Sequence, residues 1–215
     1  MLMNWPERVW IYSPFRVLSQ KGDIQKWLRL PGGDSRIDKA LEIGCGLGRG
    51  AKLLTERMGF RNVFAFDLDE TLVQRAVCNA RRGFEQNMAF FVGDAQDLPF
   101  CDSSFDAVVN FGIIHHVVDW KRCIREVSRV TREGGIFYFE EIYPPLYANP
   151  VLKRMLRHPR EDRFDENQFL KELESNNFSL LSGVRTGSRF RIVGAAVKRT
   201  VYLENDKRER RASGS

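Results

Sequence analysis

The stretch that decides the fold reads Leu41-Glu42-Ile43-Gly44-Cys45-Gly46-Leu47-Gly48-Arg49-Gly50. A short apolar run leads into closely spaced glycines, and apolar residues at helical spacing follow at Ala51, Leu54 and Met58. The pattern predicts a strand, a tight turn and a helix. Glycine suits such a turn because it adopts positive φ and lets the backbone approach a ligand. The loop also fits a variant dinucleotide fingerprint, Gly46-x-Gly48-x-x-Ala51, and therefore leaves the cofactor open.

The length favours one domain with short additions at its ends. At 215 residues, the chain suits a single α/β domain, since domains commonly contain roughly 100–200 residues. We expect an aromatic N-terminal segment over residues 1–35, a main domain over 36–203 and a disordered tail over 204–215. No apolar run approaches the ~20 residues of a membrane span, and the first residues lack a signal-peptide pattern. We therefore expect a cytoplasmic protein, as a monomer or a homodimer.

The net charge of +6 invites a nucleic-acid interpretation, but half of it lies at the end of the chain. From Lys198 onward, six basic residues face three acidic ones, which gives +3. A polar segment without periodicity is more often a solvated tail than an RNA-binding arm. The cysteines form no C-x-x-C pair, so we expect neither a metal site nor disulfides and interpret them as small buried hydrophobic residues: Cys45, Cys78, Cys101 and Cys123.

Strands and helices alternate after residue 36, which is typical of a mostly parallel sheet with helices on both faces. Asp69 is expected to cap the helix that follows the second strand. A later helix carries apolar residues at helical spacing from Trp120 to Val130, and Gly134-Gly135 is expected to stop it as a C-cap would. We expect the parallel strands over residues 41–43, 62–66, 89–92, 105–111 and 136–139.

Two segments outside this core carry aromatic residues and prolines. The first, residues 1–35, predicts a cover over a substrate pocket, an interfacial membrane contact or plain packing at the domain edge. The second, residues 144–164, is a proline-broken basic insert just past a strand, where a substrate cover or a long surface loop fits. The aromatic residues of the first segment are Trp5, Trp10, Tyr12, Phe15 and Trp27.

The C-terminal part is expected to close the sheet. Asp165 and Gln168 form a capping pair that opens a helix. Residues 178–184 and 190–197 then predict two strands of an antiparallel hairpin, with its turn at Thr186-Gly187-Ser188.

Asp67 ends the second strand, 19 residues after Gly48. An acidic side chain at the carboxyl end of the strand next to a glycine loop can accept hydrogen bonds from both ribose hydroxyls of a nucleoside. The alternative is an ordinary helix cap, which Asp69 fills better. Leu68 then suits the face of an adenine ring, because an apolar contact favours a purine.

The chain carries an ordered set of motifs at residues 41–48, 64–69, 92–100, 104–109, 115–117 and 129–135. With this set the chain resembles the class I S-adenosylmethionine-dependent methyltransferases. The resemblance is closest to the small-molecule group that includes the ubiquinone and menaquinone C-methyltransferases. It implies a Rossmann-like, seven-stranded, mostly parallel sheet with an antiparallel C-terminal hairpin.

The resemblance also implies a binding role for particular residues. Gly44, Cys45, Gly46 and Gly48 would approach the methionine part of S-adenosylmethionine, and Glu42 would reach its amino group through the loop or water. The ribose and adenine would be held by Asp67, Leu68, Asp94, Ala95 and Gln96, and the sulfonium side would be lined by Asn110, Phe111 and Gly112.

The reaction mainly requires that the acceptor atom be aligned with the methyl group. A sulfonium methyl group is already activated, so catalysis can come from orienting the nucleophile and excluding water. A general base matters only where the nucleophile loses a proton, and His115 and His116 are the candidates for it. Tyr12, Glu140 and Tyr143 are candidates for the substrate pocket.

The sequence therefore predicts transfer of a methyl group from S-adenosylmethionine to a small organic acceptor, with S-adenosylhomocysteine as the product and no metal. A non-catalytic cofactor-binding regulator and an RNA methyltransferase are the alternatives. The strand over residues 105–111 lacks an Asn-Pro-Pro-aromatic ending, which argues against an enzyme that methylates a base nitrogen of nucleic acid. A peripheral membrane contact is compatible with the same sequence.

Overall fold

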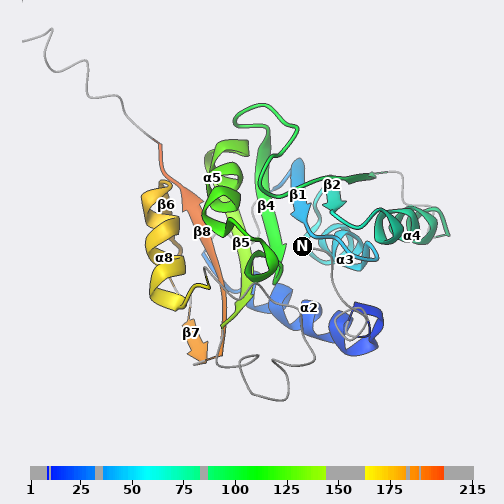
Figure 1. The fold of residues 1–215 in the computed structure, drawn as a ribbon, viewed down its shortest axis with the longest axis horizontal. Coiled ribbons are helices and arrows are strands. Elements are labelled where there is room, and N and C mark those ends of the chain that lie inside the picture. The colour runs from blue at the N-terminus through cyan, green and yellow to red at the C-terminus, as the bar shows by residue number, and fades with distance from the viewer. Residues whose placement is uncertain are drawn as a thin grey trace, which may run out of the picture.

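A computed structural model describes residues 9, 11–31, 36–82, 87–143, 163–182, 185–188 and 190–200. A sheet with the strand order β3-β2-β1-β4-β5-β8-β6 forms its centre, and β7 pairs with β8 beside this path (Figure 1). The strands are β1 Lys39–Ile43, β2 Asn62–Asp67, β3 Met88–Val92, β4 Phe105–Phe111, β5 Thr131–Ile142, β6 Phe178–Leu180, β7 Arg185–Ser188 and β8 Arg191–Lys198.

The first five strands run parallel, so their carboxyl ends meet at one edge of the sheet. β1 lies between β2 and β4, where the direction of chain winding reverses. Ligands of open α/β sheets bind outside the carboxyl ends of strands at such a point. β8 closes the sheet antiparallel to β5, from Ile136 opposite Val197 to Ile142 opposite Arg191.

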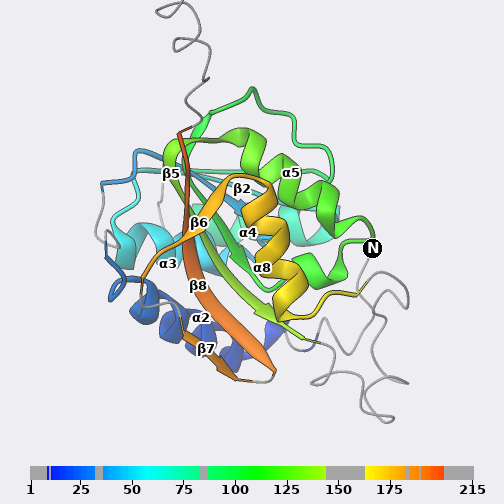
Figure 2. The same ribbon diagram turned by 90° about the vertical axis from the view of Figure 1, so that its left-hand side faces the viewer.

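Helices cover both faces of the sheet, as the alternation predicts. Side chains of α2 (Pro14–Trp27), α3 (Arg49–Met58) and α4 (Glu70–Arg82) share one core with one face of the sheet. Side chains of α5 (Trp120–Val130) and α8 (Glu166–Ser175) share a second core on the other face. Figure 2 shows α5 and α8 on one side of β8 and α3 on the other side. The predicted mostly parallel sheet with helices on both faces is thereby confirmed.

Capping residues fix where the helices begin. Asp69 Oδ1 accepts from the Thr71 amide at 3.0 Å at the start of α4. Asp165 and Gln168 form a reciprocal capping box on α8. Ser13 caps α2. The first residue of the helix is Pro14, which is tolerated there because the N–H that proline lacks would have no helical partner.

One predicted helix stop is wrong. α5 ends at Val130, and Gly134 and Gly135 lie inside β5. The helix ends early because Thr131 pairs with Phe105 at the start of β4. The two glycines instead accompany an irregularity in this pairing: Gly134 has φ +71, and a Cβ on Gly135 would lie 2.8 Å from a backbone oxygen.

The predicted C-terminal hairpin is also corrected in its details. β6 ends at Leu180, and residues 186–188 form part of strand β7 where a turn was expected. The reversal lies after Ser188, because Ser188 pairs directly with Arg191. Both β6 and β7 then pair with β8, so the closing element has three strands.

Two of the four cysteines contradict the prediction that all are buried. Cys45 and Cys123 are buried, whereas Cys78 and Cys101 are exposed; all four are free thiols. None of the helices in the described part of the chain is long and apolar enough to cross a membrane. Residues 144–162 and the tail over 204–215 lie outside the described residues, as do Trp5 and Trp10.

Candidate cofactor-binding site

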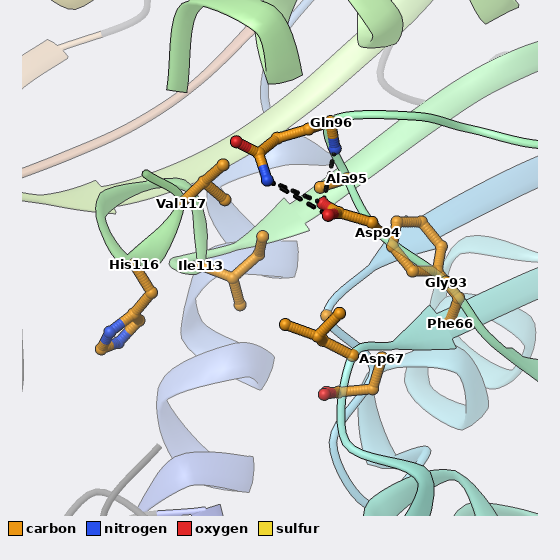
Figure 3. Close-up of a pocket in the computed structure, with 11 residues that line it drawn as sticks. Phe66, Asp67, Gly93, Asp94, Ala95, Gln96, Ile113, His116 and Val117 are labelled. Atoms are coloured by element: carbon orange, nitrogen blue, oxygen red, sulfur yellow. Dashed lines mark hydrogen bonds between the residues drawn. The ribbon is translucent and has the colours of Figure 1, made fainter. Parts of the chain in front are cut away.

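A cleft opens at the carboxyl ends of β1, β2 and β3 and beside the segment after β4, with about 530 Å³ of space that includes open solvent. Figure 3 shows Asp67 and Asp94 on one side, with Ile113, His116 and Val117 opposite. The polar groups are few and the remaining surface is mostly apolar, which suits an organic ligand. The lining residues are Gly44, Phe66, Asp67, Leu68, Gly93, Asp94, Ala95, Gln96, Ile113, His116 and Val117.

Gly44 is the residue of the glycine turn after β1 that lines the cleft. It adopts φ +72, and a Cβ at this position would lie 2.5 Å from Ile113 Cγ2 on the other side of the cleft. Gly48 adopts φ +74 and precedes the first residue of α3, where a Cβ would lie 2.9 Å from the Phe90 ring. Glycine is therefore required at Gly44 beside the cleft, and at Gly48 for packing against β3.

Asp67 holds this turn against β2 by hydrogen bonds. Its Oδ2 accepts from the Gly46 amide at 2.9 Å, and its Oδ1 accepts from the Asp69 amide at 3.0 Å. Burial raises the pKa of the Asp67 carboxyl, and the amide hydrogen bonds from Asp69 and Gly46 oppose that rise. Asp67 thus lines the cleft and holds the loop that forms its neighbouring wall.

Asp94 and Gln96 form a second polar corner. Asp94 Oδ1 accepts from the backbone amide of Gln96 at 2.9 Å, and Gln96 Nε2 donates to the Asp94 carboxylate oxygens at 3.1 and 3.2 Å (Figure 3). Gln96 Oε1 accepts from the Asp119 amide, which ties this corner to the start of α5. Leu68, with 43% of its surface exposed, lies at the rim of the same cleft.

Glu42 lies beneath the loop and does not line the cleft. Its carboxyl group is buried, and neither oxygen has a hydrogen-bond partner among the described residues. Burial raises the pKa of Glu42 to about 8, and the nearby Arg16 guanidinium and Ala51 amide offset only part of this effect. The sequence alone did not identify Arg16, which donates to the carbonyl oxygen of Phe111 at the end of β4.

A buried polar network connects the ends of β4 and β5. Glu141 Oε1 accepts from Asn110 Nδ2 and from the Ile114 amide, both at 2.7 Å. Glu141 Oε2 lies 2.6 Å from His115 Nδ1. Asn110 Oδ1 accepts from the Ile113 amide at 3.0 Å. Asn110 therefore fixes the segment that lines the cleft, and Glu141 is a residue that sequence reasoning missed.

The two histidines have different surroundings. His116 lines the cleft, whereas His115 is buried against Glu141. Their ring centroids lie 4.2 Å apart. Because only His116 reaches the cleft, only this ring is placed to meet a ligand there directly.

The three substrate-pocket candidates lie apart from the cleft. The Tyr12 hydroxyl accepts from Arg75. Glu140 forms ion pairs with Arg16 and Arg191. Tyr143 is buried beside Phe164.

Several other predicted residues also lie outside the lining: Cys45, Gly46, Gly48, Asn110, Phe111, Gly112 and His115. Conversely, the structure adds Phe66, Gly93, Ile113 and Val117 to it. The position of Phe66 and Gly93 next to Asp67 and Asp94 was the available sequence signal for two of these.

Comparison with known sequences gives one family. Residues 41–139 match the model of a methyltransferase domain. A probable phthiotriol/phenolphthiotriol dimycocerosates methyltransferase of Mycobacterium ulcerans is 38% identical over 106 residues, which is 49% of this chain and 40% of that protein. A fatty-acid O-methyltransferase of Mycolicibacterium smegmatis is 36% identical over 118 residues, 55% of this chain and 42% of that protein. The chain thus spans about two fifths of the length of these curated relatives.

Solved structures show the same fold. The YcgJ protein of Bacillus subtilis has a TM-score of 0.63 and 25% identity, covering 76% of this chain and 69% of that chain. A Pyrococcus horikoshii protein has a TM-score of 0.69 and 21% identity, covering 88% and 93%. Residues 41–139 are thus similar to a methyltransferase domain, and together with the shared fold this similarity supports a class I S-adenosylmethionine-dependent methyltransferase.

Proposed function

We propose that this protein transfers a methyl group from S-adenosylmethionine to a small organic acceptor with a long apolar part. The observation that carries the cofactor assignment is the convergence of Gly44, Asp67 and Asp94 on one cleft. Asp67 accepts from the ribose hydroxyls, Asp94 and Ala95 hold the adenine edge, and Leu68 contacts the adenine face. The bound cofactor supplies an activated methyl group, so the protein mainly binds, orients and excludes water.

The methionine end of the cofactor is assigned to the glycine turn and the end of β4. Gly44, Cys45, Gly46 and Gly48 bring backbone to it, with the buried Glu42 carboxyl behind them. The sulfonium then lies beside residues 110–112.

The acceptor is assigned to the side of the cleft formed by Ile113, His116 and Val117. These residues are apolar except for His116, which suits a lipid whose reacting group is a hydroxyl or carboxyl. Two relatives methylate such molecules by name, a fatty acid in one case and a phthiotriol in the other. His116 then takes the proton of a hydroxyl acceptor. His115 packs against the His116 ring and is itself held by Glu141.

Labelled S-adenosylmethionine tests the activity directly. Purified protein is incubated with long-chain fatty acids, long-chain diols, quinol-type phenols or total RNA, and the formation of S-adenosylhomocysteine is measured. We expect turnover with an apolar acceptor. Cofactor binding without turnover in any arm supports the regulatory alternative, and turnover with RNA alone supports the RNA methyltransferase. The four free thiols support a reducing compartment, for which we propose the cytoplasm.

Replacing Asp67 with alanine is expected to weaken S-adenosylhomocysteine binding by about 1–3 kcal/mol, because ribose hydroxyls lose a charged acceptor and the Gly46 amide loses its partner. Isothermal titration calorimetry measures the change. Asp97→Ala is the matched control, since 83% of the Asp97 side chain is exposed outside the cleft. Equal affinity of Asp67→Ala and the wild type would place the ribose elsewhere.

A further inference from the structure

The outward face of the N-terminal helical segment is apolar along its first part. Phe15 and Leu18 of α2 expose 68% and 66% of their surface, and Val9, which precedes the Ser13 cap of this helix, is also exposed. Phe15 and Leu18 are three residues apart on α2, so they lie next to each other on one helical face. We call these two residues the apolar stripe.

Basic residues continue the same face toward the end of α2. At 100° per residue, Lys26 lies within a quarter turn of both Phe15 and Leu18, and Arg29 follows just after the helix. Both side chains reach solvent. Among the described residues from 9 to 31, the one acidic residue is Asp23, which is fully buried. The exposed charge on this face is therefore entirely positive.

The opposite face of α2 is anchored to the body of the protein. Trp27 packs against Phe111 and Tyr138, with ring centroids 5.0 and 5.5 Å away. Arg191 of β8 donates to Ser19 and Asp23. Because these contacts fix the rotation of the helix, the apolar stripe cannot turn inward without breaking buried ion pairs and aromatic packing.

We propose that α2 binds the surface of an anionic phospholipid bilayer, lying in the interface with Phe15 and Leu18 among the acyl chains and Lys26 and Arg29 at the phosphates. An amphipathic helix with apolar and basic parts on one face binds such surfaces through apolar burial plus attraction to anionic lipid. The positive charge favours this partner over a neutral surface. The helix also contacts the active edge of the sheet, since Arg16 donates to the carbonyl of Phe111 at the end of β4.

Vesicle co-sedimentation of the full chain tests the proposal without knowledge of the acceptor. We expect binding to vesicles of phosphatidylcholine mixed with phosphatidylglycerol and at least roughly tenfold weaker partitioning onto phosphatidylcholine alone, as expected for two basic side chains. Phe15→Ser/Leu18→Ser is expected to lower partitioning about tenfold or more by removing buried apolar area. Lys26→Gln/Arg29→Gln is expected to remove most of the preference for anionic lipid.

Matched controls change similar residues on other surfaces. Val118→Ser/Leu180→Ser removes two exposed apolar side chains, and Arg122→Gln/Arg125→Gln removes two exposed charges on α5. Both controls should bind like the wild type, and all variants should keep its melting temperature. The proposal is overturned by absence of wild-type binding, by wild-type binding of the Phe15→Ser/Leu18→Ser variant, or by equal loss in the controls. A dimer that dissociates in Phe15→Ser/Leu18→Ser, without vesicle binding, would instead assign this face to a second copy of the chain.

Discussion

Glu141→Ala is expected to lower the free energy of unfolding by about 3–5 kcal/mol, as when one partner of a buried polar network is removed. Glu141 is fully buried and receives hydrogen bonds from Asn110 and the Ile114 amide, with His115 Nδ1 at 2.6 Å. Its loss leaves the Ile114 amide without this acceptor, and Asn110 Nδ2 with only the Glu140 carbonyl oxygen, in a buried site. Urea denaturation followed by circular dichroism measures the change.

Two further variants distinguish the effect of losing this network from the effect of removing any glutamate side chain. Glu141→Gln keeps one acceptor oxygen but turns an amide toward a donor, so we expect an intermediate loss of about 1–3 kcal/mol. Glu56→Ala removes an exposed carboxylate that pairs with Lys52 at 3.6 Å, and should cost less than about 0.5 kcal/mol. A Glu141→Ala variant as stable as Glu56→Ala would show that the network contributes nothing measurable.

Glu42→Gln is expected to become progressively more stable than the wild type as the pH rises from 5 to 8. Burial raises the pKa of Glu42 in the folded protein from 4.5 to about 8. Between these values the folded state holds a proton that the unfolded state has lost, so wild-type stability falls as the pH rises. The loss is about 1.4 kcal/mol per pH unit, or about 3–4 kcal/mol across the window. Glutamine has a similar shape and does not titrate.

Thermal and urea unfolding of Glu42→Gln and of the wild type at several pH values gives the difference between their free energies of unfolding. Only this difference is informative, because other groups also titrate, among them Asp23, whose pKa burial raises to about 6. Glu56→Gln serves as the exposed control and should give a constant offset. Parallel stability profiles for Glu42→Gln and the wild type would mean that the Glu42 carboxyl is ionised throughout the range.

The parallel half of the fold could be predicted because its signals are local. β4 has the bounds that its apolar run predicts, and the strand–turn–helix unit around Gly44 follows from glycine spacing. Caps such as Asp69 depend on hydrogen bonds to the next few residues, which the sequence displays directly. Helices and strands defined by such short-range rules are therefore found at nearly their true bounds.

The errors occur where distant pairing overrides a local signal. Gly134-Gly135 has the composition of a helix end, yet Thr131 already pairs with Phe105 on a neighbouring strand. Thr186-Gly187-Ser188 has the composition of a turn, yet β7 pairs with β8. Both outcomes depend on which strand lies alongside, and a single sequence does not show that.

The residues of the candidate site also fall into those that the local sequence predicts and those whose partners are distant in the chain. Asp67 and Asp94 were predictable because Asp67 ends a strand and Asp94 follows one, at the edge where ligands bind. Arg16 and Glu141 were not, since their partners Phe111 and Asn110 lie 95 and 31 residues away in the chain. No periodicity marks a side chain that acts across such separations.

The anchor of α2 also sets the order in which the protein can assemble during synthesis. Arg191 and its partner Asp23 are 168 residues apart. At about 5–20 residues per second, translation leaves α2 without this partner for roughly 10–30 seconds after the helix has been made. Throughout that interval α2 lacks its ion pair with Arg191, so the face that carries Ile24 and Trp27, as well as the apolar stripe, is available to a chaperone or a membrane before β8 has been made.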